Sequence, residues 1–160
     1  MADFAKLIKE LKEKGLTIGA VESFTAGLFS SRLGEIPGAS SVFRGSLITY
    51  APELKVSLAG VKAETIRQKG VVSQEVALEM AVGGRKALDA DICVSFTGDA
   101  GPTLEKGNDK VGEAYLCVAT ARQNIVLHPR FKGERNAIRA SAADMACEYL
   151  ITLLEKGSIA

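Results

Sequence analysis

Hydroxyl groups that could act as nucleophiles lie where a predicted strand gives way to a helix. The apolar segment Thr17 to Glu22 predicts a strand, and Ser23 and Thr25 follow it at the start of a helix expected to reach Leu33. In α/β proteins ligands bind beyond the carboxyl ends of strands, and the free N–H groups at a helix start favour anions. Ser23 could therefore attack a carbonyl carbon beside an anion or oxyanion cradle. The alternative interpretation is that both hydroxyls only cap the helix.

A serine hydroxyl needs a base to accept its proton before it attacks a carbonyl, and Lys55 is the candidate base. Tyr50 ends a second predicted strand, Phe43 to Tyr50, and Lys55 lies in the short helix that follows. A lysine partly removed from water has a lowered pKa and can accept a proton, which Tyr50 could relay or orient. In the alternative interpretation, Tyr50 packs at an interface and Lys55 is solvated. His128, the one histidine in the sequence, precedes Pro129 in a predicted strand, and we expect it to be structural or exposed.

A small, glycine-containing turn follows a third predicted strand, Asp91 to Thr97, which is apolar enough to be buried on both faces. The turn Gly98-Asp99-Ala100-Gly101-Pro102 would let its backbone approach a ligand, but it lacks the length of a Walker loop and precedes no helix. Arg135 and Arg139 lie four residues apart on the final predicted helix and could hold a phosphate, or they could form a solvated surface. If the first and third strands are neighbours, both turns open on one edge of the sheet and form one site.

The composition argues against several classes of partner. Lys and Arg (20) nearly balance Asp and Glu (19), so the chain has no broad basic field for nucleic acid. Apolar runs are too short to span a bilayer, and Met1-Ala2-Asp3-Phe4-Ala5-Lys6 is amphipathic rather than signal-like. Cys93, Cys117 and Cys147 lie far apart in apolar stretches, where we expect buried, reduced thiols and no metal site. The sequence thus predicts a cytoplasmic protein with no nucleic-acid or membrane partner.

Helix and strand patterns alternate along the 160 residues and end in a pair of consecutive strands. Asp3 is expected to cap a first helix that buries Phe4, Leu7, Ile8 and Leu11 and ends at Gly15. Further helices are expected over Glu53 to Ala59, Ala63 to Lys69 and Glu134 to Glu155. Another helix is expected to begin at Ser73, with Val76, Met80 and Ala87 facing inward. A long loop from Gly98 to Lys110 precedes the last two strands, which are expected over Val111 to Thr120 and Asn124 to Phe131. This order predicts a single α/β domain over residues 1–160, with a mixed, mostly parallel sheet between helical layers.

Taken together and in order, these segments resemble the CinA C-terminal domain family over almost the whole chain. The resemblance rests on Glu22-Ser23-x-Thr25-x-Gly27, Pro37-Gly38-Ala39-Ser40, Thr49-Tyr50 with Lys55, Gly70-x-Val72-Ser73, Gly98-x-Ala100-Gly101-Pro102, Val111-Gly112, and Gly133-x-Arg135 with Arg139. Each motif is weak alone, whereas the ordered set is specific. The resemblance implies a three-layer α/β/α sandwich, no cofactor, a stand-alone homo-oligomeric form, and hydrolysis of nicotinamide mononucleotide to nicotinic acid mononucleotide and ammonia.

The resemblance also implies roles for individual residues. Ser23 would be the nucleophile, Lys55 the base and later the acid, and Tyr50 a proton relay, with Ser40 as a rival nucleophile. The implied substrate-binding residues are Glu22, Thr25, Gly27, Thr97, Gly98, Ala100, Gly101, Arg135 and Arg139, the two arginines serving the phosphate.

Three departures from the family pattern keep alternatives open. The family usually has Cys-Thr-Gly-Gly where this chain has Phe24-Thr25-Ala26-Gly27, a polar residue in place of Pro52, and a glycine-rich stretch in place of residues 103–110. These departures favour two other hypotheses: a non-catalytic relative that binds a mononucleotide or a partner, and a hydrolase of a different amide.

Overall fold

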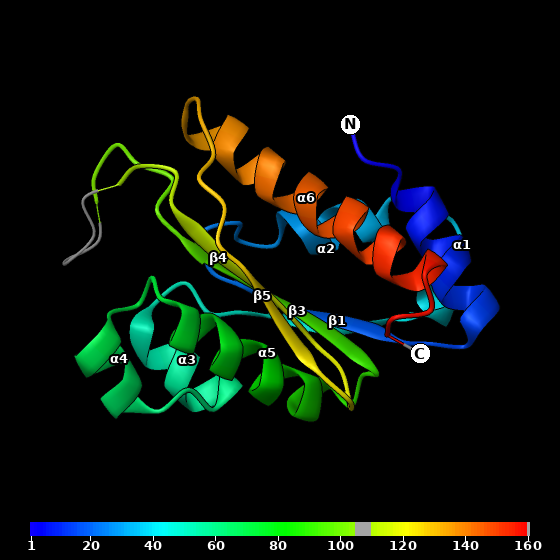
Figure 1. Ribbon diagram of the computed structural model, residues 1–160, viewed down its shortest axis with the longest axis horizontal. Coiled ribbons are helices and arrows are strands. Elements are labelled where there is room, and N and C mark those ends of the chain that lie inside the picture. The colour runs from blue at the N-terminus through cyan, green and yellow to red at the C-terminus, as the bar shows by residue number, and fades with distance from the viewer. Residues whose placement is uncertain (105–109, 160) are drawn as a thin grey trace.

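A five-stranded mixed sheet in the order β2-β1-β3-β4-β5 forms the centre of the molecule (Figure 1). The computed structural model describes residues 1–104 and 110–159, so part of the loop expected before Lys110 lies outside the described residues. The strands are β1 (Ile18–Glu22), β2 (Phe43–Ile48), β3 (Ile92–Gly98), β4 (Ala114–Ala119) and β5 (Asn124–Leu127). β1 pairs in parallel with β2 and β3, while β4 is antiparallel to β3 and β5. The mixed, mostly parallel sheet is therefore confirmed.

Helices cover both faces of this sheet (Figure 1). One layer contains α1 (Phe4–Lys14), α2 (Leu28–Gly34) and α6 (Arg135–Glu155), and the other contains α3 (Pro52–Ala59), α4 (Ala63–Lys69) and α5 (Gln74–Leu88); a short 3-10 helix, η1, spans Ala39–Ser41. The expected three-layer sandwich is confirmed. None of the described helices is both long enough and apolar enough to cross a membrane.

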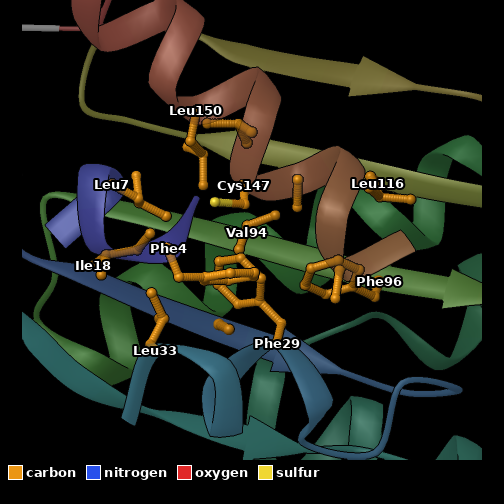
Figure 2. Close-up of a cluster of buried hydrophobic side chains, with 14 of the residues drawn as sticks. Phe4, Leu7, Ile18, Phe29, Leu33, Val94, Phe96, Leu116, Cys147 and Leu150 are labelled. Carbon is orange, nitrogen blue, oxygen red and sulfur yellow. The ribbon is translucent and has the colours of Figure 1, made fainter. Parts of the chain in front are cut away.

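The larger hydrophobic core lies between the sheet and the layer of α1, α2 and α6 (Figure 2). The Phe29 ring of α2 packs against the rings of Phe4 and Phe96, with centroids 5.7 Å and 5.3 Å apart. Cys147 and Leu150 of α6 complete this part of the cluster. Aromatic pairs at such separations add to the free energy gained by burying apolar surface, so α2 and α6 are held firmly on β3.

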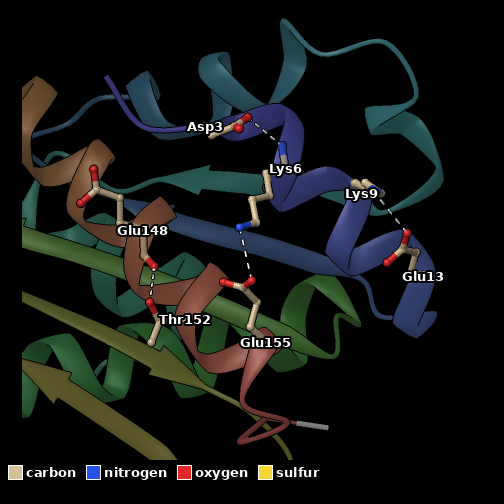
Figure 3. Close-up of polar contacts among 7 residues, drawn as sticks. All are labelled: Asp3, Lys6, Lys9, Glu13, Glu148, Thr152 and Glu155. Carbon is tan, nitrogen blue, oxygen red and sulfur yellow. Dashed lines mark hydrogen bonds and ion pairs between the residues drawn. The ribbon is translucent and has the colours of Figure 1, made fainter.

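Polar contacts on the outside of the same layer fix the ends of α1 (Figure 3). The Asp3 carboxylate accepts the backbone N–H of Lys6 at 2.9 Å, as the expected cap requires. The Lys6 ammonium lies 3.3 Å from the Glu155 carboxylate of α6. This pair is half exposed, so the packed core, not the ion pair, provides most of the stability.

Two glycines of α5 let the second helical layer approach the sheet and α3 closely. A Cβ atom on Gly83 would lie 1.6 Å from the Ala59 carbonyl oxygen, and one on Gly84 would lie 2.2 Å from the Val21 Cγ2 atom. Close packing is therefore the reason for this Gly-Gly pair. The absence of side chains at Gly83 and Gly84 lets α3 and the sheet pack directly against α5.

Ala87 of α5 was expected to face inward, but it is exposed, so that prediction is wrong.

Most boundary differences concern the ends of strands and the start of α2. α2 begins at Leu28 and not at Thr25, because residues 23–27 form a turn in which the Ala26 N–H donates to the Ser23 carbonyl at 2.9 Å. Ala26 and Gly27 both have positive φ angles, of 49° and 95°, which a helix start cannot continue. β5 ends at Leu127, two residues before Pro129, which has no N–H for a strand ladder.

Candidate active site

The carboxyl ends of three neighbouring strands converge on one cavity. Ser23 directly follows β1, Asp99 directly follows β3, and Tyr50 lies two residues after the end of β2. Because β1 lies between β2 and β3, the chain leaves these parallel strands at the point where ligands bind in open α/β sheets. The cavity has a volume of about 340 Å³ and is lined by Ser23, Phe24, Tyr50, Gly98, Asp99, Ala100, Gly101, Thr103, Leu104 and Arg135. Such a volume is at the lower end of the range of roughly 300–1,000 Å³ for small-molecule sites.

Lys55 reaches Ser23 from α3. Its Nζ atom lies 3.0 Å from the Ser23 Oγ atom, and it also donates to the Thr49 carbonyl at 2.7 Å and the Tyr50 carbonyl at 3.4 Å. Pro52 occupies the first turn of α3, where its missing N–H costs nothing, and starts the helix that carries Lys55. Lys55 is only 2% exposed, so the interpretation as a solvated lysine is wrong.

The hydrogen bond between Lys55 and Ser23 can run in either direction. An ammonium donates to the hydroxyl oxygen, whereas a neutral amine accepts the hydroxyl proton and turns Ser23 into a nucleophile. The carbonyls of Thr49 and Tyr50 hold two N–H groups of Lys55 in both protonation states. The arrangement therefore has the geometry of a serine nucleophile paired with a lysine base.

The turn that presents Ser23 does not cap α2 through its hydroxyls. The N-cap residue of α2 is Gly27, and neither the Ser23 nor the Thr25 hydroxyl accepts an N–H group of this helix, so the capping interpretation of these two residues is wrong. The N–H of Phe24, beside the nucleophile on the cavity wall, takes part in none of the hydrogen bonds found within residues 1–104 and 110–159. A backbone N–H in this position could stabilise negative charge on a carbonyl oxygen attacked by Ser23.

Arg139 holds this turn from α6. Its Nε–H donates to the Phe24 carbonyl at 3.0 Å, and an Nη2–H donates to the Thr25 carbonyl at 2.8 Å. A third donor contacts the Asn136 side chain at 3.0 Å. Arg139 is not among the residues that line the cavity, so the structure places it behind the Ser23 turn and not at a phosphate site.

Arg135, one turn earlier on α6, lines the cavity and bridges two of its walls. One terminal nitrogen donates to the Gly101 carbonyl at 2.8 Å, and the other donates to the Tyr50 hydroxyl at 2.6 Å. Tyr50 is 53% exposed and contacts Lys55 through its backbone carbonyl, not through its phenol group. The described contacts therefore link the Tyr50 hydroxyl to Arg135 and give no path for a proton relay to Lys55.

Several expected binding residues support the site without lining the cavity. The buried Glu22 carboxylate accepts the N–H groups of Phe29 and Ser30 at 3.1 Å and 2.9 Å, at the start of α2. The Thr97 hydroxyl donates to the Val71 carbonyl at 2.7 Å. Thr25 is buried, and Gly27 adopts the left-handed conformation that ends the turn. These four residues shape the cavity from outside.

Ser40 lies far from Ser23 and Lys55 along the sheet. It is exposed in η1, which leads into the amino end of β2, whereas the cavity is at the carboxyl end. Val42, two residues after Ser40, accepts the N–H of Ile18 at the amino end of β1. The structure therefore does not bring the rival nucleophile to the cavity.

Asp99 is the one charged cavity residue that the sequence-based assignment of the site omitted; Phe24, Thr103 and Leu104 were omitted as well. Asp99 is only 4% exposed, and its position directly after a buried strand was the available signal. Gly98, Ala100 and Gly101 of the same turn line the cavity, as do Thr103 and Leu104, the described start of the altered loop. Phe24, which stands where the family usually has a cysteine, is buried, and its side chain belongs to the main hydrophobic core.

Metal ligands do not gather in the part of the chain that the structure describes. There, no group of three or more His, Cys, Asp or Glu side chains is arranged to hold an ion. His128 lies apart from the cavity residues, stacked on Tyr115 at a centroid distance of 3.9 Å and 2.8 Å from the Glu113 carboxylate.

Comparison with known proteins agrees with this architecture. The chain is 40% identical over 158 residues to a protein of Bacillus subtilis (strain 168) named as competence-damage inducible, and 41% identical over 150 residues to a CinA-like protein of Petrotoga mobilis. These matches cover 96% and 94% of this chain but only 38% and 37% of the relatives, so the chain spans little more than a third of their length.

Solved structures give the same result. The competence/damage inducible protein CihA from Agrobacterium tumefaciens is 31% identical, with a TM-score of 0.89 over 96% of each chain. A CinA superfamily protein from Klebsiella pneumoniae shares the fold at a TM-score of 0.93, over 96% of each chain, with 24% identity. The model of the CinA C-terminal domain matches residues 3–154. The chain therefore belongs to the family of CinA C-terminal domains.

Proposed function

We propose that this protein is an amidohydrolase that converts nicotinamide mononucleotide to nicotinic acid mononucleotide and ammonia. The observation that carries the proposal is the 3.0 Å contact between the buried Lys55 Nζ and Ser23 Oγ, with Ser23 on the wall of a cavity. Family membership supports the choice of reaction through the resemblance of the Ser23, Tyr50, Lys55 and Arg135 motifs.

The reaction divides into two steps on these residues. In the first, neutral Lys55 accepts the Ser23 proton while Oγ bonds to the carboxamide carbon. The Phe24 N–H lies beside the position where the oxyanion forms. The protonated Lys55 then gives its proton to the departing nitrogen, so that the C–N bond breaks, ammonia leaves and an ester on Ser23 remains. In the second step Lys55 accepts a proton from water, whose oxygen bonds to the ester carbon, and the proton returns to Ser23 as the acid is released.

Arg135 supports a phosphate-bearing substrate at the mouth of the cavity. Two of its hydrogen bonds go to the Gly101 carbonyl and the Tyr50 hydroxyl, which fix the guanidinium at the cavity wall. A guanidinium has five N–H donors, so donors remain for phosphate oxygens. Gly98, Ala100 and Gly101 also line the cavity and have little or no side chain, so their backbone allows a close approach by the ligand.

The test is a steady-state assay of purified protein with nicotinamide mononucleotide, with ammonia and the acid product both measured. We expect turnover by the unmodified protein and none by Ser23→Ala, while Ser57→Ala, an exposed serine on α3, should retain full activity. Binding of the mononucleotide without turnover would instead indicate the non-catalytic relative. Turnover of another carboxamide with the mononucleotide left unchanged would indicate a hydrolase of a different amide.

A further inference from the structure

We propose that Tyr50 is a positioning residue for phosphate recognition and not a proton relay. Its hydroxyl holds the Arg135 guanidinium at the mouth of the cavity, in an orientation that receives the phosphate of the ligand. This inference rests on the proposed function and deepens it, because it assigns Tyr50 to the selection of the mononucleotide over substrates that have no phosphate.

Tyr50 makes two separate contacts, one through its backbone and one through its side chain. Its carbonyl accepts an N–H of Lys55 at 3.4 Å, whereas its hydroxyl accepts an N–H of Arg135 at 2.6 Å. The contact with the base therefore uses an atom that phenylalanine would keep, and the contact with Arg135 uses an atom that phenylalanine would lose. The substitution Tyr50→Phe thus separates the two.

The backbone on both sides of Tyr50 is fixed, so its ring starts from a defined place. The N–H of Thr49 donates to the Glu22 carbonyl at 2.9 Å, which keeps this end of β2 beside β1. On the other side, Ala51 has the extended backbone that a following proline favours, and Pro52 begins α3. Tyr50 is 53% exposed and lines the cavity, so its ring lies at the mouth of the cavity and not in the core.

Arg135 is held from two sides at the start of α6. One of its terminal nitrogens donates to the Gly101 carbonyl at 2.8 Å, and the other donates to the Tyr50 hydroxyl. Because the guanidinium is planar, anchors on two different nitrogens fix the direction of all five N–H groups. A side chain that is already ordered loses less conformational entropy when a ligand binds, so the two anchors favour binding of a phosphate.

Loss of the Tyr50 hydroxyl should affect ligands unequally. Arg135 would then keep only its contact with Gly101, and a phosphate would have to order the guanidinium as it binds. A ligand without a phosphate does not use this group, and the Lys55 contact with Ser23 involves no atom of the Tyr50 side chain. Positioning therefore predicts weaker binding of phosphate-bearing ligands alone, whereas a proton relay predicts a lower kcat for every substrate.

The first experiment is a double-mutant cycle on binding of nicotinamide mononucleotide, measured by calorimetry in a Ser23→Ala background where no turnover interferes. The four proteins are this parent, Tyr50→Phe, Arg135→Gln and the combination of both. We expect Tyr50→Phe to raise the dissociation constant by a factor that is roughly threefold or more larger with Arg135 present than with Arg135→Gln. A smaller ratio of the two factors would overturn the inference, because the hydroxyl would then act without Arg135.

Kinetics with Ser23 intact separate positioning from proton transfer. We expect Tyr50→Phe to raise KM for the mononucleotide and to keep its kcat within about threefold of the unmodified protein. The value of kcat/KM for nicotinamide riboside should stay within the same factor. A larger fall in either quantity would overturn the inference, since it would show that the hydroxyl takes part in the chemical step.

The matched control is Tyr149→Phe, which removes the same hydroxyl from a tyrosine about four turns further along α6 and outside the cavity lining. It should change neither binding nor kinetics, and thermal unfolding checks that each variant is folded. Binding of the mononucleotide with a ratio below threefold removes only the role of Tyr50, whereas absence of both binding and turnover removes the proposed function.

Discussion

The Lys55 Nζ atom lies 3.0 Å from the Ser23 Oγ atom although 32 residues separate the two in sequence. The contact follows from the sheet order, because β1 and β2 are parallel neighbours whose carboxyl ends meet. Ser23 leaves β1 at that edge, and α3 starts four residues after β2 ends at the same edge. Lys55 lies in the first turn of α3, close to this edge, and its side chain therefore reaches Ser23.

Replacing Lys55 by Arg separates proton transfer from positive charge. An arginine keeps the charge and can donate to the carbonyls of Thr49 and Tyr50, but it does not lose a proton in proteins and so cannot serve as a base. We expect both Lys55→Arg and Lys55→Met to lower kcat on the order of 10³-fold or more. Steady-state kinetics of ammonia release check this.

The control for Lys55 is Lys62→Arg, an exposed lysine just after α3, which should retain full activity. Thermal unfolding of each variant separates loss of catalysis from loss of folding. A folded Lys55→Arg variant that kept more than a tenth of the kcat of the unmodified protein would contradict the role of Lys55 as a base. It would indicate that Ser23 needs only a positive charge at this position.

Arg135 and Arg139 should have different kinetic signatures, because only Arg135 lines the cavity. We expect Arg135→Gln to raise KM for the mononucleotide roughly tenfold or more, with little effect on nicotinamide riboside, which has no phosphate. Arg139→Gln loosens the carbonyls of Phe24 and Thr25 that position Ser23, so it should lower kcat for both substrates by a similar factor. Parallel kinetics with the two substrates provide the comparison. An Arg139 variant that affected only the phosphate-bearing substrate would contradict this assignment.

The sequence predicted the layers well because its signals are local and repeated. Phe4, Leu7, Ile8 and Leu11 lie on one helical face and are all buried, and the run from Ile92 to Thr97 forms the central strand of the sheet. The placement of Ser23 and Lys55 was also accessible, since Ser23 follows β1 and the helix that contains Lys55 follows β2, at the carboxyl ends of two neighbouring parallel strands.

Other features of the site depend on side-chain directions that spacing does not encode. Arg135 and Arg139 are one helical turn apart, yet one lines the cavity and the other binds backbone carbonyls behind it. Glu22 adjoins Ser23, but successive strand residues point to opposite faces, so its carboxylate reaches α2 instead. Ser40 belongs to one of the motifs that resemble the family, but the structure places it before the amino end of β2, whereas the cavity lies at the carboxyl end.

Two buried threonines near the site should respond differently to the same substitution. The Thr97 hydroxyl donates to the Val71 carbonyl at 2.7 Å, whereas the Thr49 hydroxyl has no hydrogen-bond partner within the described residues. Valine has nearly the same shape as threonine. Thr97→Val leaves a carbonyl unpaired and should lower the free energy of unfolding by about 1–3 kcal/mol, whereas Thr49→Val should leave it unchanged or raise it. Urea unfolding of the two variants measures both effects, and equal losses would contradict the assignment.

The three cysteines should make the protein lose stability in alkaline solution. Burial raises the pKa of the thiols of Cys93, Cys117 and Cys147 from 9.0 to about 12. A group whose pKa is higher in the folded state stabilises the fold fully below its unfolded pKa, and that contribution is lost as the pH rises from about 9 toward 12. The free energy of unfolding should therefore fall more steeply between pH 8.5 and 10.5 in the unmodified protein than in the variant with all three cysteines replaced by alanine. Urea unfolding across this range tests the prediction, and equal slopes for the two proteins would refute it. Iodoacetamide gives an independent check, because it should leave the native thiols unmodified near pH 8 and label all three only after denaturation.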